Sequence, residues 1–280
     1  MAQKAQCLLC PHRCRLAEGR CGVCRARICR EGKVIDLAYA QISALALDPI
    51  EKKPLRRFHP GSWILSLGSC GCNLRCPFCQ NSGISMRAPD PRDETLLPED
   101  LVALALKLKE SDPRGNLGVA FTYNEMLAPH YEYVRDCAAL AKERGLATVL
   151  VTNGFIEERP LLELLPLIDA ANVDLKGFSE GFYKWLGGSL KSVKRSLELM
   201  AGKIHLEVTT LVIPGKNDSA EEMDAECAFL EALSPEIPLH LSRFFPRYKC
   251  ADLPPTPPET VLSLCDIARR RLKYVYPGNM

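Results

Sequence analysis

Residues 68–81 read Gly-Ser-Cys-Gly-Cys-Asn-Leu-Arg-Cys-Pro-Phe-Cys-Gln-Asn and directly follow the apolar run Trp63–Leu67. Here Cys72, Cys76 and Cys79 have the spacing C-x3-C-x2-C. A loop that follows a strand is where α/β proteins build active sites. Three thiolates on one tight loop can hold three irons of a [4Fe–4S] cluster, and the fourth iron then lacks a protein ligand. The alternative is a structural zinc site or an ordinary four-cysteine cluster, with Cys70 as the fourth ligand.

The composition is that of a soluble globular protein, with 47% apolar and 25% charged residues in 280. The 36 basic and 34 acidic residues give a net charge of +2, which does not indicate a nucleic-acid or membrane partner. No apolar run is long enough to span a membrane, and the amino terminus lacks the apolar core of a secretory signal. We therefore expect a cytoplasmic protein.

The fourteen cysteines are concentrated at the start of the chain, where ten of them precede residue 80. Disulfides are rare in a reducing compartment, so the clustering predicts metal or redox chemistry. Cys137, Cys227 and Cys265 instead fall in apolar helical patterns, which is typical of small core residues.

From residue 61 onward, strand-like runs alternate with helical patterns. The expected strands are Trp63–Leu67, Gly118–Thr122, Thr148–Thr152, Ala171–Leu175, Leu206–Ile213 and Leu239–Phe244. The expected helices cover Leu101–Leu108, Tyr131–Lys142, Leu161–Ile168, Val193–Met200, Glu221–Leu233 and Glu259–Leu272. Six βα units predict a parallel sheet, either an open partial (β/α)6 TIM-like barrel or a doubly wound sheet. We assign 61–280 to this core domain and 1–60 to a small Cys-rich unit that binds metal.

The cysteine loop after the first strand, with the aromatic Phe78 before its third cysteine, resembles the radical S-adenosylmethionine (radical SAM) enzymes. That resemblance implies a [4Fe–4S] cluster whose open iron chelates S-adenosylmethionine. It also implies a flavodoxin- or ferredoxin-type electron donor. The chemistry implied is reductive cleavage of the cofactor to methionine and a 5′-deoxyadenosyl radical, which abstracts hydrogen from a substrate.

Three strand-end motifs resemble those of the glycyl-radical-enzyme activating branch: Val151-Thr-Asn-Gly-Phe155, Val173-Asp-Leu-Lys176 and Val212-Ile-Pro-Gly-Lys-Asn-Asp218. Four further motifs resemble the radical SAM enzyme of the AmmeMemoRadiSam system: Cys10-Pro-His-Arg-Cys14, Asp48-Pro-Ile-Glu-Lys-Lys-Pro54, Phe121-Thr-Tyr-Asn-Glu125 and Tyr274-Val-Tyr-Pro-Gly-Asn279. The resemblance implies a protein or peptide substrate. The rivals are the same chemistry on a small molecule or RNA, and a non-enzymatic zinc-binding scaffold.

The resemblance also implies which residues contact the cofactor, namely Phe78, Asn124, Glu125, Asn153, Asp174, Lys176, Thr209 and His240. Several have a structural alternative. Asn124 and Glu125 fit a helix cap, and Asn153 fits a turn. Asp174 and Lys176, two apart on a strand, fit an ion pair, and His240 fits a satisfied core residue. Thr209 stands where activating enzymes carry an arginine, and Glu207 on the same strand face is the residue that could compensate.

The leader has six cysteines, and the pattern C-x2-C-x3-C with a later cysteine suits a four-thiolate site. The chosen ligands, which match the relatives' pattern, are Cys7, Cys10, Cys14 and Cys24, with His12 as a substitute. Thiolates suit both zinc and a second iron–sulfur cluster, so the metal stays open. The arginines and lysine at 243, 247, 249 and 269–271 are interpreted as a solvated face, with the binding of a substrate peptide or carboxylate as the alternative.

Overall fold

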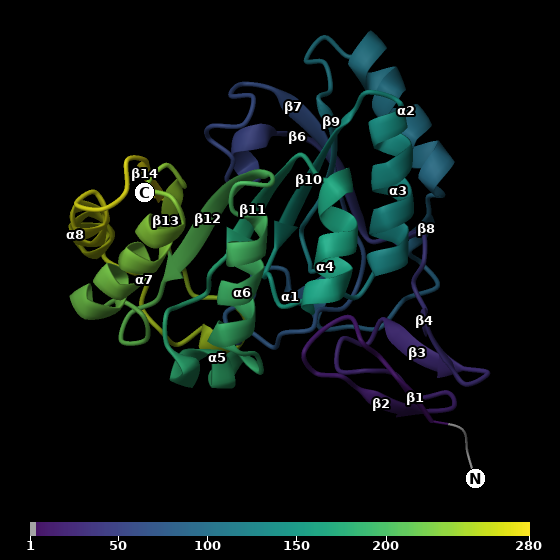
Figure 1. Ribbon diagram of the computed structural model, residues 1–280, viewed down its shortest axis with the longest axis horizontal. Coiled ribbons are helices and arrows are strands. Elements are labelled where there is room, and N and C mark those ends of the chain that lie inside the picture. Colours follow the sequence, from purple (N-terminus) through teal and green to yellow (C-terminus); the bar gives the residue numbers. More distant parts are fainter. Residues whose placement is uncertain (1–3) are drawn as a thin grey trace.

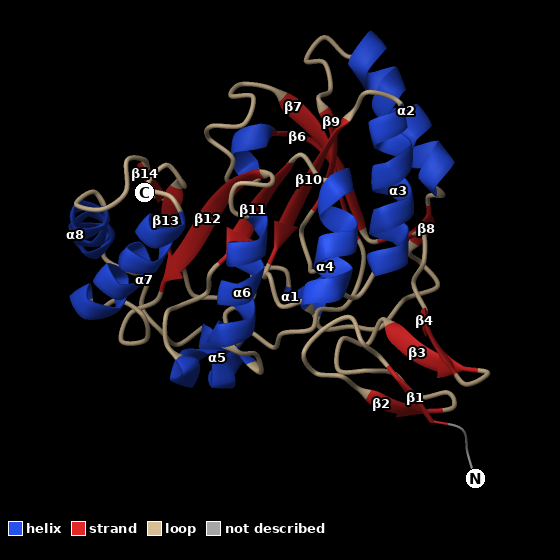
Figure 2. Cartoon of the chain, in the orientation of Figure 1, coloured by secondary structure: helices blue, strands red, loops and turns tan. Residues whose placement is uncertain are grey.

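The computed structural model describes residues 4–280, so the first three residues of the predicted leader lie outside it. Its centre is one eight-stranded sheet (Figures 1 and 2). The strands are β6 (Ala44–Pro49), β7 (Trp63–Gly68), β9 (Gly118–Phe121), β10 (Ala147–Thr152), β11 (Ala170–Asp174), β12 (His205–Val212), β13 (Leu239–Arg243) and β14 (Val275–Gly278). All six predicted strands are present to within one residue at each end.

The strand order is β14-β13-β12-β11-β10-β9-β7-β6, so the strands after β6 follow the chain order without a reversal. All pairs are parallel except β6 with β7. A doubly wound sheet requires a reversal of the strand order, which is absent from the sheet of residues 44–278. The two edge strands, β6 and β14, do not pair with each other, so the sheet is the open alternative of the two predicted.

The crossovers place the helices on one face of the sheet, because parallel crossovers share one hand (Figures 1 and 2). The helices are α1 (Ser82–Ser85), α2 (Pro98–Ser111), α3 (Tyr131–Glu143), α4 (Glu158–Leu164), α5 (Glu180–Leu186), α6 (Leu190–Met200), α7 (Ala220–Leu233) and α8 (Pro258–Ala268). Cys137, Cys227 and Cys265 are buried in the core between helices and sheet, as predicted. No helix within residues 4–280 has the length and apolarity needed to cross a bilayer.

The other face of the sheet is covered near β6 by the segment that follows this strand. Ile50 and Leu55 are fully buried there against Ile64, Ala120 and Val149. The predicted leader therefore ends earlier than residue 60. The chain enters the main sheet at residue 44 with the edge strand β6, and Ile50 and Leu55, which follow β6, cover this face of the sheet.

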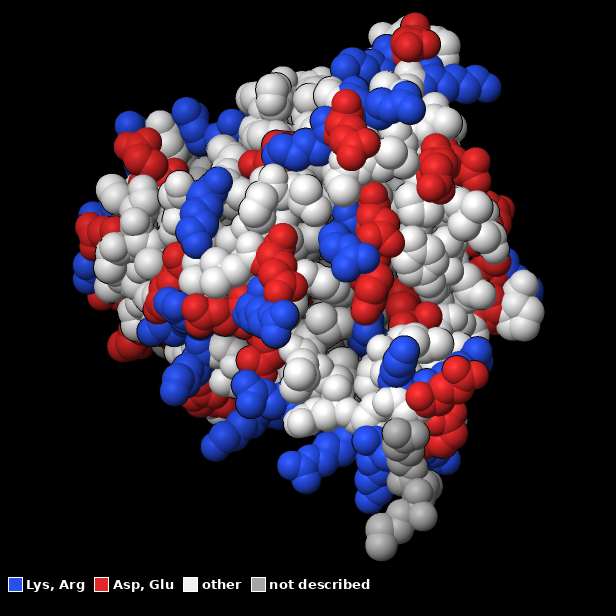
Figure 3. Space-filling model, turned by 45° about the vertical axis from the view of Figure 1, so that its right-hand side comes forward, with Lys and Arg blue, Asp and Glu red and all other residues white. Residues whose placement is uncertain are grey.

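The leader itself is built from two hairpins that lie below the carboxyl ends of the strands in Figure 1. Its strands are β1 (Lys4–Gln6), β2 (Arg15–Ala17), β3 (Arg27–Arg30) and β4 (Lys33–Asp36). A third short pair, β5 (Gln41–Ile42) with β8 (Glu94–Thr95), joins the segment after the leader to the loop before α2. Acidic and basic side chains are interspersed over the face in Figure 3, as a net charge near zero leads one to expect.

Gly118, the first residue of β9, is a position where the sheet requires glycine. A Cβ atom there would lie 1.9 Å from the carbonyl oxygen of Ala147 on β10. We expect Gly118→Ala to lower the free energy of unfolding by about 2 kcal/mol or more, because the backbone of a parallel pair must separate to admit it. Urea unfolding followed by circular dichroism measures this loss.

The matched control is Gly181→Ala in α5, where nothing lies within 4 Å of the added atom. Alanine is a better helix former than glycine, so this variant should keep or slightly raise the stability. Equal stability of the two variants would contradict the close approach at Gly118.

Candidate active site at the cysteine loop

A cavity of about 910 Å³ opens at the carboxyl ends of the strands, and the loop after β7 forms one of its walls. Cys72, Cys76 and Cys79 all line this cavity. The residues for which the resemblance implied cofactor contact line it as well: Phe78, Asn124, Glu125, Asn153, Asp174, Lys176, Thr209 and His240. The loop after β7 and the strands β9 to β13 thus bring together side chains that are far apart in the chain, such as Cys72 and His240.

The three thiols lie in a setting that suits a bound metal cluster. Burial raises the pKa of Cys72 well above its usual value and that of Cys76 to about 12, although the Lys176 ammonium opposes the rise at Cys76. A thiolate at neutral pH therefore needs a metal to stabilise its charge. Within residues 4–280, no three His, Cys, Asp or Glu side chains converge as ligands of a single ion. A cubane cluster, which presents a different iron to each thiolate, does not require such convergence.

Cys70, the alternative fourth ligand, is not among the residues that line this cavity. Its side chain is fully buried, and burial raises its pKa to about 11 although the nearby Arg87 guanidinium opposes the rise. Arg87 is in turn paired with Asp93. The structure therefore does not bring Cys70 to the three thiols of the loop.

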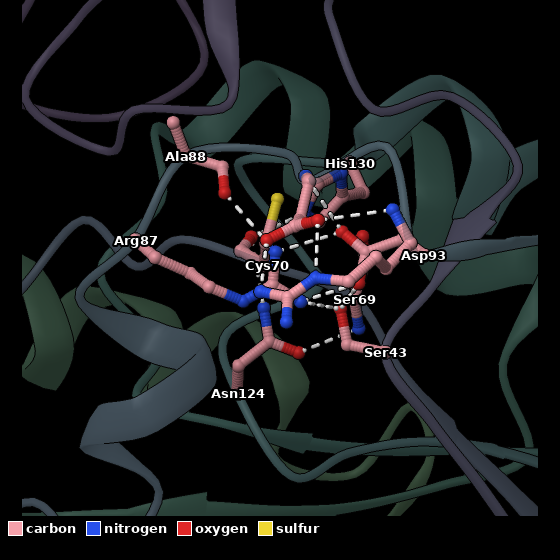
Figure 4. A network of polar contacts seen from close by, with 10 residues as sticks. Ser43, Ser69, Cys70, Arg87, Ala88, Asp93, Asn124 and His130 are labelled. Carbon is pink, nitrogen blue, oxygen red and sulfur yellow. Dashed lines mark hydrogen bonds and ion pairs between the residues drawn. The ribbon is translucent and has the colours of Figure 1, made fainter.

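Asn124 fixes the backbone of the loop just before the first of the three thiols (Figure 4). Its Oδ1 accepts a hydrogen bond from the backbone N–H of Ser69 at 2.9 Å. Its Nδ2 donates to the carbonyl oxygens of Cys70 (3.1 Å) and Gly71 (2.8 Å). One amide side chain thus satisfies three buried backbone groups. This role differs from the helix cap that the sequence analysis gave as the structural alternative to cofactor contact.

Gly71 lies where the leader meets the loop. Its φ is +76°, a backbone conformation that favours glycine, and a Cβ atom there would lie 2.2 Å from the carbonyl oxygen of Cys24. His12 adds a second contact, because its Nε2 lies 2.8 Å from the carbonyl oxygen of Asn73. The leader therefore packs directly against the loop that carries the three thiols.

Glu125 is a buried carboxylate whose two oxygens already have protein donors. They accept from the hydroxyl of Thr152 (2.8 and 3.0 Å) and from the backbone N–H groups of Asn153 (2.7 Å) and Leu127 (2.9 Å). Burial raises the pKa of Glu125, and these donors oppose the rise. A cationic group that entered the cavity beside it would favour the ionised form.

Asn153 braces the same loop from the end of β10. Its Nδ2 donates to Oδ1 of Asn73 at 2.9 Å, and its Oδ1 accepts from the N–H of Phe155. The Nδ2 of Asn73 then donates to the Phe155 carbonyl oxygen. Asn153 therefore has both the turn role that the sequence allowed and a place on the cavity wall.

Asp174 and Lys176 form an ion pair of 2.7 Å at the end of β11. Thr209 on β12 has a buried hydroxyl oxygen for which residues 4–280 supply no hydrogen-bond partner. A buried hydroxyl without a partner is costly, and because this oxygen is also closed to solvent, it could reach a ligand in the cavity only after the side chain rotates. Phe78 packs with Phe182 and Trp185 at the edge of the same wall.

The Nε2–H group of His240 donates to Oε2 of Glu207 at 2.6 Å, because the ionised carboxylate can only accept. Glu207 does not line the cavity. It also accepts from His205 and from the backbone N–H groups of Arg56 and Arg57, at 2.8 to 3.0 Å. Burial opposes its charge, but these donors hold the pKa of Glu207 at about 2. Glu207 therefore holds the segment that follows β6, through the backbone of Arg56 and Arg57. It does not take the place of the arginine that activating enzymes carry at the position of Thr209.

Tyr123 is a feature that sequence patterns did not assign to any role. It lines the cavity with a φ of +65°, which is unusual for a bulky residue. Its hydroxyl donates to Asp48 at 2.6 Å, and the Lys53 ammonium lies 2.8 Å from Asp48 and 4.7 Å from the tyrosine ring centroid. Burial opposes the charge of Asp48, but Lys53 and Tyr123 hold its pKa at about 2.

The four leader cysteines chosen from the sequence, Cys7, Cys10, Cys14 and Cys24, line one small cavity of about 10 Å³. Cys21 and Cys29 do not line it. Burial raises the pKa of Cys10 to about 12, and the neighbouring thiols add to the rise. Nε2 of His12, the substitute ligand, is bound to the carbonyl oxygen of Asn73, so only its Nδ1 could bind a metal without breaking this contact.

His130, at the start of α3, joins the leader to the cysteine loop (Figure 4). Its Nδ1 lies 3.1 and 3.2 Å from the carboxylate oxygens of Asp36, and its Nε2 lies 2.7 Å from the carbonyl oxygen of Cys70. Both partners accept hydrogen bonds, so both ring nitrogens carry protons. Burial opposes this charge, but Asp36 and the Cys70 carbonyl outweigh it and raise the pKa of His130.

Comparison with known proteins agrees with this geometry. Residues 67–227 match the profile of the Radical SAM superfamily. An uncharacterized protein of Methanocaldococcus jannaschii is 39% identical over 282 residues, which cover 99% of this chain and 82% of that protein. The chain therefore belongs to the radical SAM superfamily, whose members use a [4Fe–4S] cluster and S-adenosylmethionine.

Two further comparisons concern one enzyme of similar sequence and one solved structure of similar fold. Pyruvate formate-lyase 1-activating enzyme of Escherichia coli K12 is 29% identical over 154 residues, which cover 53% of this chain and 60% of that enzyme. A radical SAM methyltransferase from Sphaerobacter thermophilus has the same fold, with a TM-score of 0.61 over 79% of this chain and 67% of that chain at 16% identity. The cysteine loop, the cavity and the family agree on generic radical SAM chemistry.

The His130–Asp36 pair predicts a pH-dependent contribution to stability. A histidine whose pKa is raised stabilises the fold below its unfolded pKa, and this stability is lost as the pH rises through the folded pKa. We expect Asp36→Asn to lower the free energy of unfolding by about 3 kcal/mol near pH 6 and by less near pH 9. Urea unfolding at the two pH values measures the difference.

The control for this experiment is Asp252→Asn, at an exposed position. It should change the stability little and equally at both pH values. A loss in Asp36→Asn that does not shrink with rising pH would show that His130 is not charged in the folded protein.

Proposed function

We propose that this protein is an activating-enzyme-like radical SAM enzyme that acts on a protein or peptide. When bound, the cluster and S-adenosylmethionine supply reductive cleavage of the cofactor and a radical that abstracts hydrogen. The observation that supports the proposal is the joint lining of one 910 Å³ cavity by the three thiols and by the polar strand ends. We further propose that, within this class, the protein is of the type found in the AmmeMemoRadiSam system, which its sequence motifs resemble.

In this proposal, different residues of the chain hold the cluster, position its loop and bind the cofactor. Cys72, Cys76 and Cys79 would hold three irons, and the amide of Asn124 keeps their loop in place. Glu125 and the Asp174–Lys176 pair offer acceptors and a donor for the amino, carboxylate and ribose groups of the cofactor. Thr209 offers a hydroxyl that has no other partner.

The size of the cavity supports a second ligand beside the cofactor. At about 910 Å³ it lies near the upper end of the roughly 300–1,000 Å³ of small-molecule pockets. A peptide substrate would insert only a short segment there. The rival small-molecule substrate fits the same volume, so the choice of a peptide rests on the likeness to the activating enzyme.

The test is made on anaerobically purified, iron-reconstituted protein. With dithionite and S-adenosylmethionine, we expect 5′-deoxyadenosine by mass spectrometry and roughly four irons per chain in the core. Cys76→Ala should abolish both the visible absorbance of the cluster and the formation of the product. Product formation by Cys76→Ala would refute the assignment of the loop.

Cys265→Ala is the matched control, because Cys265 is a buried core residue of α8 far from the loop in sequence. It should keep the iron and the product, with a stability loss of about 1 kcal/mol for the lost packing. Zinc in place of iron, together with no product from the unsubstituted protein, would favour the scaffold rival.

We also propose that the leader binds a single metal ion, zinc, through Cys7, Cys10, Cys14 and Cys24. A cavity of about 10 Å³ has room for about one water-sized particle, which is too small for a four-iron cluster. The thiols do not yet converge on one point, so they would have to rotate inward when they bind the ion. Four thiolates around one zinc form a closed structural site.

Cys10→Ala should remove one zinc per chain and destabilise the leader, because zinc-site binding energy is folding energy. The matched control is Cys21→Ala, an exposed leader cysteine outside the cavity, which should keep the zinc. Metal analysis by mass spectrometry measures both. A loss of roughly four irons in Cys10→Ala would instead make the leader site a second cluster.

A further inference from the structure

Some of the basic side chains that line the large cavity are paired with carboxylates, and others are not. Lys53 is paired with Asp48 and Lys176 with Asp174. Arg243 and Arg247 also line the cavity, but no carboxylate of residues 4–280 lies within ion-pair distance of either guanidinium. Arg243 is half-buried at the cavity, whereas Arg247 is exposed and also lines the cavity. Arg269 and Arg271, which follow α8, instead pair with surface carboxylates.

Arg243, the last residue of β13, has a fixed orientation. Its Nε donates to the carbonyl oxygen of Thr256, and its guanidinium carbon lies 4.8 Å from the ring centroid of Phe245. Thr256 is itself fully buried and is held by a hydrogen bond from its hydroxyl to Val212. These contacts occupy the Nε side of the guanidinium and leave its two Nη groups without protein partners among the described residues.

Arg247 lies in the loop that follows β13, and this loop is tied to the thiol loop. The backbone N–H of Lys249 donates to the carbonyl oxygen of Pro77 at 2.8 Å, between Cys76 and Cys79 in sequence. Arg247 is exposed and makes no hydrogen bond to residues 4–280 through its side chain. A guanidinium two residues before this anchor is held near the cysteine loop while it stays free to bind a ligand.

Arg243 lies apart from four of the residues expected to bind the cofactor. Of the other expected contacts, His240 shares strand β13 with Arg243, but its Nε2 is bound to Glu207. Glu125, Asn153, Asp174 and Lys176 follow β9, β10 and β11, whereas Arg243 ends β13, two strands further along the sheet. The cavity therefore has a half beside the thiols and strand ends β9–β11, and a second half at β13. An anion of the cofactor would be held in the first half.

We propose that the substrate carries an anionic group, a carboxylate or a phosphate, which Arg243 and Arg247 bind at the β13 side of the cavity. This inference rests on the proposed function, because it names the substrate chemistry of the same site. The planar guanidinium fork matches both oxyanions, and charge-assisted hydrogen bonds of this type are among the stronger ones in proteins. For a peptide, the matching group is an acidic or phosphorylated side chain.

The test measures anion binding to the full-length, cluster-loaded protein in its oxidised state, with and without S-adenosylmethionine. The probes are pyrophosphate and a hexaglutamate peptide, titrated by isothermal calorimetry. We expect one probe or both to bind in the presence of the cofactor. Binding of pyrophosphate alone assigns a phosphate, and binding of hexaglutamate alone assigns a carboxylate. The double variant Arg243→Gln/Arg247→Gln should weaken the binding roughly tenfold or more.

The matched control is Arg269→Gln/Arg270→Gln at the end of α8, which removes the same charge outside the cavity. It should bind the probes as the unsubstituted protein does. Thermal unfolding of both double variants establishes that they are folded. Glutamine keeps the polarity and part of the apolar stem of arginine, so a folded variant with weakened binding reports on the lost guanidinium.

Three results would overturn the proposal: no binding of either probe, equal binding by the Arg243→Gln/Arg247→Gln variant, or displacement of the probes by S-adenosylmethionine. The last result would put the anion in the place of the cofactor. Failure of the proposed function is a separate result. It would appear as cofactor binding without 5′-deoxyadenosine in the unsubstituted, reduced protein, whereas anion binding is measured without reduction.

Discussion

The amide of Asn124 is the contact on which the site depends, because it satisfies three backbone groups of the segment that leads to the first thiol. The chain leaves β7 and must turn sharply at Gly71, so Ser69, Cys70 and Gly71 cannot form sheet hydrogen bonds with their neighbours. Unpaired backbone groups in a buried turn would each cost free energy comparable to a lost hydrogen bond. A side chain from the end of β9 supplies the partners, and the loop is thereby held at the mouth of the barrel before any metal binds.

Hydrogen bonds between side chains and the backbone also hold the neighbouring strand ends in place. Glu125 accepts from the ends of β9 and β10, and Asn153 continues the chain of contacts to Asn73 on the loop. These residues line the cavity and also brace its wall, so their geometry is set before a ligand arrives, which is the arrangement that positions reacting groups well. The groups with spare capacity are few. They include the hydroxyl of Thr209 and the Nη atoms of Arg243.

The sequence predicted the six parallel strands from apolar runs such as Gly118–Phe121 of β9, which is buried on both faces. It missed β6 and β14, since both contain a proline, which argues against a strand except at a sheet edge, where these two strands lie. The thiol loop was evident because its ligands are local in sequence. The His130–Asp36 pair was not, because 94 positions separate its members and neither belongs to a motif. The place of Arg243 and Arg247 in the cavity lining was not evident, because a charge run does not reveal which side chains face a cavity.

Gly71 and the Cys24 carbonyl oxygen have a consequence for protein engineering. The leader meets the thiol loop through a backbone contact so close that no side chain fits between them. Exchange of the leader for a homologous or designed one would therefore have to reproduce the position of a single peptide group to within a few tenths of an ångström, whatever its surface residues were. Sequence similarity on the leader surface would be a poor guide to compatible chimeras, and the backbone path from residue 24 to residue 26 would be a good one.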